Sequence, residues 1–253
     1  MATTQSEVGQ IYLMEDFGGA EVPAALTTHF ENLGQFRVTG EGLEGNTAGL
    51  VNLTSAGLNG VGRMTTMSDT DKDSIFIRTG VIFDVALMGP LVAECRIKSE
   101  TITTQQCWFG FANISGTDDC IEDEIVDTVS GGTTIDDLTA TGMCGFLRTS
   151  ELTAVAEFHA IYKGGTTTCS STSTNQELGV TYTAGDFMIL RLEIDPNGDA
   201  RWYVDGVLKK TVVTAAPLTT DMALILGLET QTAGAASMDV DYIWVKANRD
   251  WTV

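Results

Sequence analysis

The sequence predicts an all-β fold, a two-sheet antiparallel sandwich of the jelly-roll type. Three observations support this prediction. First, apolar side chains alternate along the segment 187–194, and four of them share one face: Met188, Leu190, Leu192 and Ile194. Second, turn signals separate several segments of this kind. Third, helical patterns are nearly absent, and the only candidate is a short acidic turn within 117–126. Antiparallel strands that bury one face build β-sandwiches.

The C-terminal third shows the strand pattern in most detail. Asp195-Pro-Asn-Gly198 has turn chemistry, because proline presets φ and Gly198 accepts a positive φ. The following strand, 200–204, should turn Trp202 toward the core and Tyr203 toward solvent. Asp205-Gly206 is a two-residue hairpin signal that leads into a returning strand. Two further strands are expected at 222–228 and 238–246.

More strands are expected along the rest of the chain: 11–17, 48–53, 74–78, 92–97, 107–112, 143–148 and 155–162. We expect the first strand, near Tyr12–Phe17, to lie beside the last, near Met238–Lys246. No linker interrupts the pattern, and the chain has only four prolines. The sequence therefore predicts one sandwich domain over 11–253, preceded by an N-terminal arm over 1–10.

The composition excludes some classes of partner. The 253 residues include 34 acidic and 14 basic side chains, giving a formal net charge of -20. This charge argues against a general electrostatic surface for nucleic acid or anionic membrane, and favours a cation or a basic partner. No apolar run approaches the roughly 20 residues that span a bilayer. The first residues lack a secretion signal's basic start and apolar core, which predicts synthesis in the cytoplasm.

Five cysteines are present at wide spacing: Cys95, Cys107, Cys120, Cys144 and Cys169. No Cys-x-x-Cys pair occurs, so a zinc site is disfavoured. We expect buried free thiols in general. Cys120 and Cys169 lie in polar loops, and we expect these two to be the more exposed.

Two motifs resemble those of a known superfamily. Trp202-Tyr-Val-Asp-Gly206 has the form of a hairpin, and Asp239-Val-Asp-Tyr-Ile-Trp-Val245 that of a final strand. Together they resemble the closing strands of the concanavalin A-like lectin/glucanase (LamG-like) superfamily. In that superfamily an early strand pairs with the last one, and Glu15-Asp-Phe17 is similar to its end. The resemblance implies the fold rather than a function, because lectins, hydrolases, lyases and structural modules share this fold.

The catalytic patterns of the superfamily are incomplete in this chain. Its glucanases carry Glu-x-Asp-x-x-Glu on one strand, where Glu193 and Asp195 match but Gly198 takes the third position. Its lyases use a histidine with a tyrosine. His159 and Tyr162 differ by three positions, so they should lie on opposite faces of a strand, as a partly buried histidine beside an exposed tyrosine. We therefore expect no enzymatic activity.

An acidic segment is the candidate metal site. Its carboxylates could be held together by Ca²⁺, a hard cation that takes oxygen ligands, or they could form a solvated loop. The residues concerned are Asp118, Asp119, Glu122, Asp123 and Glu124, together with Asp127 shortly after them. No other cofactor is expected.

Carbohydrate binding requires exposed aromatic rings, and Tyr203 and Trp108 are the candidates. Each belongs to an aromatic pair on a strand, so one ring of each pair should face outward. The alternative is that these rings belong to the sandwich core.

The remaining functional hypothesis comes from family likeness and elimination. We expect a non-enzymatic virion structural protein of a tailed bacteriophage, a capsid decoration or cement protein assembled in the host cytoplasm. Its partners would be the major capsid protein and copies of itself, and neither nucleic acid nor membrane. The N-terminal arm would contribute the contacts: Met1, Ala2, Thr3, Thr4 and Gln5. The alternatives are a lectin-like module that binds a glycan, or a glycan hydrolase or lyase of the same fold.

Overall fold

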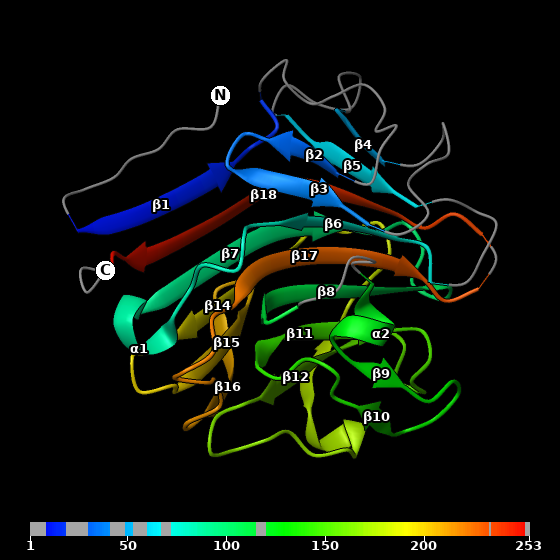
Figure 1. Ribbon diagram of the computed structural model, residues 1–253. Coiled ribbons are helices and arrows are strands. Elements are labelled where there is room, and N and C mark those ends of the chain that lie inside the picture. The colour runs from blue at the N-terminus through cyan, green and yellow to red at the C-terminus, as the bar shows by residue number, and fades with distance from the viewer. Residues whose placement is uncertain are drawn as a thin grey trace.

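Two antiparallel sheets pack face to face and contain most of the strands (Figure 1). The computed structural model describes residues 9–18, 30–40, 49–52, 60–66, 72–114, 120–232 and 234–250. Both sheets contribute to one cluster of buried hydrophobic side chains. The predicted two-sheet antiparallel sandwich is confirmed.

Sheet A contains both the first and the last described strand. Its order is β16 (Val207–Val212), β15 (Ala200–Val204), β14 (Met188–Ile194), β7 (Leu91–Lys98), β18 (Ser237–Asn248), β5 (Gly62–Thr65) and β4 (Gly49–Asn52). The long β18 also pairs with β1 (Gln10–Glu15), in a register that sets Gln10 against Asn248. The expected pairing of the first strand with the last is confirmed.

Sheet B combines strands from the N-terminal third, the middle and the C-terminal third of the chain. Its order is β13 (Glu177–Thr181), β12 (Glu157–Lys163), β11 (Met143–Thr149), β8 (Gln105–Ala112), β17 (Ala223–Thr230), β6 (Ser74–Arg78), β3 (Phe36–Thr39) and β2 (Phe30–Leu33).

The remaining elements are short. They are α1 (Val85–Met88), α2 (Ile121–Glu124), the 3-10 turn Ser173–Asn175, and a ribbon of β9 (Asp127–Thr128) and β10 (Ile135–Asp137). The expected acidic helical turn is α2. The sequence patterns missed α1, which Asp84 caps by accepting a hydrogen bond from the Leu87 amide. None of the helices in the described ranges could span a bilayer.

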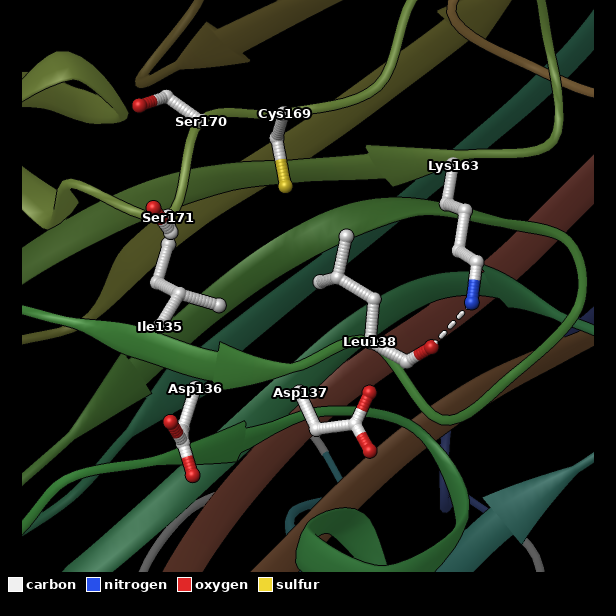
Figure 2. Close-up of a pocket in the computed structure, with 8 residues that line it drawn as sticks. All are labelled: Ile135, Asp136, Asp137, Leu138, Lys163, Cys169, Ser170 and Ser171. Carbon is white, nitrogen blue, oxygen red and sulfur yellow. Dashed lines mark hydrogen bonds between the residues drawn. The ribbon is translucent and has the colours of Figure 1, made fainter.

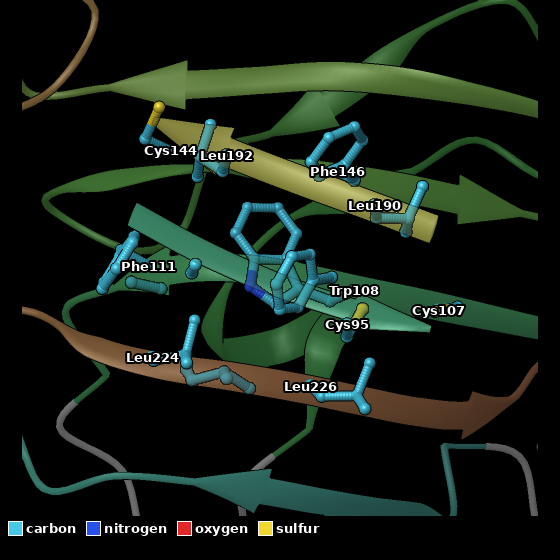
Figure 3. Packing of buried hydrophobic residues seen from close by; sticks show 14 of the residues in the cluster. Cys95, Cys107, Trp108, Phe111, Cys144, Phe146, Leu190, Leu192, Leu224 and Leu226 are labelled. Atoms are coloured by element: carbon cyan, nitrogen blue, oxygen red, sulfur yellow. The ribbon is translucent and has the colours of Figure 1, made fainter. Parts of the chain in front are cut away.

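The core between the sheets follows the predicted alternation. Every second side chain of β14 and β15 is buried, including Trp202, as the sequence predicts. Trp202 joins the sheets directly, because its indole Nε1 donates to the Gly145 carbonyl of sheet B at 2.9 Å. Figure 3 shows Leu190 and Leu192 of sheet A among aromatic side chains of sheet B.

The predicted turns are also present. Asp205 and Gly206 both have positive φ angles, 49° and 76°, as a tight two-residue hairpin requires. Gly198 has φ 84°, and its amide donates to the Asp195 carbonyl.

The outer faces of the two sheets differ in burial. The outward side chains of β7, β14 and β15 are partly exposed, so this face of sheet A meets solvent. In sheet B every residue of β8, β11 and β17 is buried. A second layer is made of α2, β9 and β10 and adds its apolar side chains to the core cluster; in Figure 1, α2 lies in front of β8 and β11, with β9 and β10 below it. Trp108 lies in this covered face over Gly145, where a Cβ would come within 2.6 Å of the indole.

All five cysteines are buried and free. The expectation that Cys120 and Cys169 are exposed is wrong. Their side chains pack under the second layer and beside β12, with relative exposures of 1% and 7%. Polar residues around a cysteine show only that the segment itself is polar. Whether the cysteine side chain is buried depends on how that segment packs against the rest of the fold.

Replacing Trp202 with alanine should destabilise the fold strongly. The change leaves a cavity between the sheets and removes the donor to Gly145, so we expect a loss of about 3–5 kcal/mol in the free energy of unfolding. The matched control is Tyr203→Ala, on the same strand but the outer face, where about 1 kcal/mol or less is expected. Urea unfolding followed by fluorescence measures both. Equal losses would contradict the assigned faces of β15.

Candidate ligand-binding face

A row of aromatic and charged side chains crosses the outer face of sheet A. The strand register sets Tyr203 of β15 against Arg191 of β14, then Glu94 of β7, then Trp244 of β18. All four side chains are partly exposed. We call this set the outer row. Aromatic rings beside planar polar groups on a solvent-facing sheet are the elements that sugar binding needs.

A β-bulge places Trp244 in the outer row. The register between β18 and β7 shifts between Val240 and Tyr242, and Asp241 is the extra residue. Before the bulge Met238 and Val240 point into the core, whereas after it Ile243 and Val245 do. Without the shift, strict alternation from Met238 would turn Trp244 inward.

Hydrogen bonds centred on Glu94 fix the orientation of the outer row. One oxygen of Glu94 accepts from the Tyr242 hydroxyl at 2.9 Å and from Trp244 Nε1 at 3.3 Å. Its other oxygen lies 3.7 Å from Arg191 Nη1. Arg191 also lies 5.8 Å from the centre of the Trp244 ring. The aromatic and cationic groups are therefore held in place before any ligand arrives.

Two arginines neutralise the carboxylates that matched the glucanase pattern. Glu193 accepts from Arg191 at 2.6 Å and from Arg201 at 3.3 Å, and Asp195 accepts two hydrogen bonds from Arg201 at 2.7 Å. Burial alone would raise the pKa of Glu193, but the arginines outweigh it and hold that pKa below its usual value. Hydrogen bonds from Arg201 likewise lower the pKa of Asp195. Both groups stay ionised, which does not suit a proton donor.

A pocket lies at one end of the outer row, beside the β1–β18 pair. Its volume is about 310 Å³. It is lined by Gln10, Pro90, Val92, Arg191, Trp244, Lys246, Ala247 and Asn248. Tyr12 of β1 lies just beyond it, with its ring centre 5.9 Å from that of Trp244. The pocket thus combines an indole face with two amide side chains and two cations.

A second pocket, of about 270 Å³, lies between β10 and the segment after β12. Figure 2 shows its lining residues: Ile135, Asp136, Asp137, Leu138, Lys163, Cys169, Ser170 and Ser171. Lys163 donates to the Leu138 carbonyl across one side of it. Its lining contains no aromatic ring, so it offers no stacking surface for a sugar.

Three carboxylates converge on the covered side of sheet B. Oxygens of Glu122, Asp127 and Glu151 lie within 4.8 Å of one another. Glu151 Oε2 also accepts from the Thr128 hydroxyl at 2.6 Å. Burial, together with the charges of Glu151 and Asp127, raises the pKa of Glu122 to about 7. We call these three residues the acidic cluster. Their oxygen donors match the ligands that Ca²⁺ takes.

The acidic cluster overlaps the predicted metal site only in part. Glu122 and Asp127 belong to it, but Asp123 is exposed and pairs with Lys72 at 2.8 Å, and Glu124 is not among its three carboxylates. Asp118 and Asp119 lie outside the described residues. Sequence reasoning missed Glu151, because it follows β11 and reaches the cluster only through packing of the second layer.

The two predicted sugar-binding aromatics differ in outcome. Trp108 is fully buried, because the second layer covers its face of sheet B, and its ring does not fit the role of a sugar platform. Tyr203 is partly exposed, and its hydroxyl lies 3.3 Å from Glu193 Oε2. The predicted arm contacts, Met1, Ala2, Thr3, Thr4 and Gln5, lie outside the described residues.

His159 and Tyr162 point to opposite faces of β12, as predicted. Tyr162 faces the core, where its ring centre lies 5.8 Å from that of Trp202. His159 pairs in register with Leu147, which pairs in turn with Trp108 on the covered face. Both side chains are buried, whereas we expected the tyrosine to be exposed. Burial lowers the pKa of His159, which keeps the ring neutral.

Solved structures share this architecture at low sequence identity. A protein of unknown function from Shewanella oneidensis MR-1 matches 100% of this chain and 92% of its own, with 15% identity and a TM-score of 0.57. The carbohydrate recognition domain of Emp47p matches 96% of each chain, with 10% identity and a TM-score of 0.54. Bacillus licheniformis β-glucanase matches 95% of this chain and 98% of its own, with 16% identity and a TM-score of 0.51.

The fold is therefore concanavalin A-like. At these identities the likeness concerns the fold and does not extend to a function. No protein-family model matches the sequence, and no curated protein matches it.

Replacing Glu122 with glutamine should stabilise the protein in a pH-dependent way. The folded-state pKa of about 7 lies above the usual value of 4.5, so the stability linked to the protonated Glu122 is fully present below pH 4.5 and is lost as pH rises through 7. At pH 8, Glu122→Gln should raise Tm by about 2–4 °C, which corresponds to about 1 kcal/mol. At pH 5 the gain should shrink. Thermal unfolding at both pH values measures this.

The matched control for this pH experiment is Asp221→Asn, which makes the same charge change at an exposed position. It should shift Tm equally little at pH 5 and pH 8. A gain from Glu122→Gln that is equal at the two pH values would contradict a raised pKa at Glu122.

Proposed function

We propose that this protein is a non-enzymatic carbohydrate-binding module that binds through the outer face of sheet A. The observation that carries the proposal is the outer row, in which Trp244 and Tyr203 flank Arg191 on a solvent-facing sheet. Indole and phenol rings stack on the apolar faces of sugars, while guanidinium and amide groups donate to hydroxyls. The lectin-like neighbours support the proposal at the level of fold only.

The absence of catalysis is part of the same proposal. The Glu193 and Asp195 carboxylates are paired with arginines, and Gly198 lies in a turn where the pattern needs a third acid. Glu122, whose pKa is raised to about 7, belongs to the layer over sheet B rather than to the outer row. The protein should bind an oligosaccharide without releasing new reducing ends.

Replacing Trp244 with alanine should weaken oligosaccharide binding at least tenfold, about 1.4 kcal/mol, because the main stacking surface is lost. Tyr203→Ala should weaken it less, since that ring lies at the other end of the row. A glycan array identifies a ligand, and calorimetry measures its affinity for each variant. The control is Leu87→Ala, which removes an exposed apolar side chain in α1. Unchanged affinity in a folded Trp244→Ala protein would overturn the proposal.

Calcium is the proposed cation for the acidic cluster. The support is the oxygen donor set of Glu122, Asp127 and Glu151, and the pKa of Glu122, which burial and the charges of Glu151 and Asp127 raise although Lys72 lies 3.8 Å away. Calcium at pH 8 should raise Tm, and Asp127→Asn should remove that gain because it deletes a charged ligand. Asp221→Asn is again the control. Equal gains in wild type and Asp127→Asn would contradict binding at this cluster.

A capsid-decoration role in a tailed-phage virion is a second proposal, favoured by the edge strand β16. Three apolar side chains at this edge are exposed. Val207 and Leu208 of β16 are 55% and 49% exposed, and Val213, the residue after the strand, is 63% exposed. In the described part of the chain β16 pairs on one side only, so its free edge could add a strand from a second copy or a major capsid protein. Native mass spectrometry should then show an oligomer, and a monomer at micromolar concentration would count against it.

A further inference from the structure

The pocket at the end of the outer row has a charge opposite to that of the protein. The chain carries 34 acidic and 14 basic residues, yet the pocket is lined by two cations, Arg191 and Lys246, and by no carboxylate. With this excess of acidic residues, a pocket placed at random would be expected to have more carboxylates than cations in its lining. Low-dielectric walls beside such a pocket concentrate its field and favour an anionic ligand.

The two cations have different surroundings. Arg191 is held by Glu193 at 2.6 Å and by Glu94 at 3.7 Å, and neither carboxylate lines the pocket. Its guanidinium is therefore held in one orientation, because Nε and Nη2 both donate to Glu193 and Nη1 lies near Glu94, and its partial role in the pocket is to add positive potential to one wall. Lys246 is exposed and forms no ion pair with the residues that the structure describes. Lys246 is the cation with charge available to a ligand.

The rest of the pocket suits a saccharide rather than a bare ion. Trp244 supplies a ring face, and the amides of Gln10 and Asn248 come from paired positions on β1 and β18. The volume of about 310 Å³ lies at the lower end of the range for small-molecule sites, about 300–1,000 Å³. An inorganic anion would leave the indole and most of this space unused.

We propose that this pocket binds a negatively charged saccharide unit, one that carries a carboxylate or a sulfate. The sugar ring stacks on Trp244, and its anionic group lies between Lys246 and the guanidinium of Arg191. The inference rests on the proposed carbohydrate-binding function and adds the charge class of the ligand.

The test compares charged oligosaccharides with neutral partners of the same skeleton. One arm uses tetragalacturonate and its methyl ester, and the other a sulfated galactan oligosaccharide and its desulfated form. Calorimetry at low and high salt measures each affinity. We expect at least tenfold tighter binding of the charged member in one arm, with affinity that falls as salt rises. The arm that shows it identifies the anionic group.

Lys246→Gln supplies the variant, and Lys209→Gln, at an exposed position on β16, supplies the control with the same charge change. Lys246→Gln should reduce affinity for the charged ligand about tenfold and leave the neutral partner unaffected. Lys209→Gln should change neither. Both sites are exposed, and thermal unfolding verifies that both variants fold.

The outcomes separate this inference from the function on which it rests. If the neutral partner binds as tightly as the charged one, or if Lys246→Gln weakens both equally, the charge class is wrong and carbohydrate binding stands. If no oligosaccharide of either charge binds, both proposals are overturned.

Discussion

The carboxylate of Glu229 accepts hydrogen bonds from Gln106 Nε2 and from the backbone amide of Ile121. Glu229 is fully buried in β17, and burial raises its pKa well above the usual value. A buried carboxyl is tolerated only where donors satisfy it, so these contacts are needed for its place in sheet B. Ile121 begins α2, and the same bond fixes the second layer to the outer face of that sheet. The sealing of sheet B depends on this contact.

Because the second layer covers the outer face of sheet B, the outer face of sheet A is the one that meets solvent. Its outer side chains are held by cross-strand contacts, chiefly those of Glu94 with Trp244 and Arg191. The bulge at Asp241 turns Trp244 outward and sets the indole beside the guanidinium. One irregularity in the last strand therefore decides whether this face carries an aromatic platform. The bulge affects both the fold and the proposed binding face, because β18 lies centrally in sheet A and also carries Trp244.

The sequence predicted sheet A better than sheet B, for a physical reason. β14 and β15 have one face in solvent, so the alternation of apolar and polar residues shows which side chains point to the core. Trp202 and Tyr203 lie as expected. β8 is buried on both faces, so its sequence contains no phase that would reveal the burial of Trp108. The acidic cluster was found only in part, because Glu151 joins Glu122 through tertiary packing. Of the outer row the sequence predicted only Tyr203, and it missed Trp244, since a bulge cannot be read from alternation.

We propose that sheet A presents the binding face while sheet B is closed. Hydroxyl-radical footprinting distinguishes the two faces, because the oxidation of each aromatic side chain reports its contact with water. We expect Trp244 and Tyr203 to be oxidised in the free protein and protected by a bound oligosaccharide, while Trp108 stays unmodified in both states. Oxidation of Trp108 in the free protein, with protection on binding, would contradict this proposal and move the binding face to sheet B.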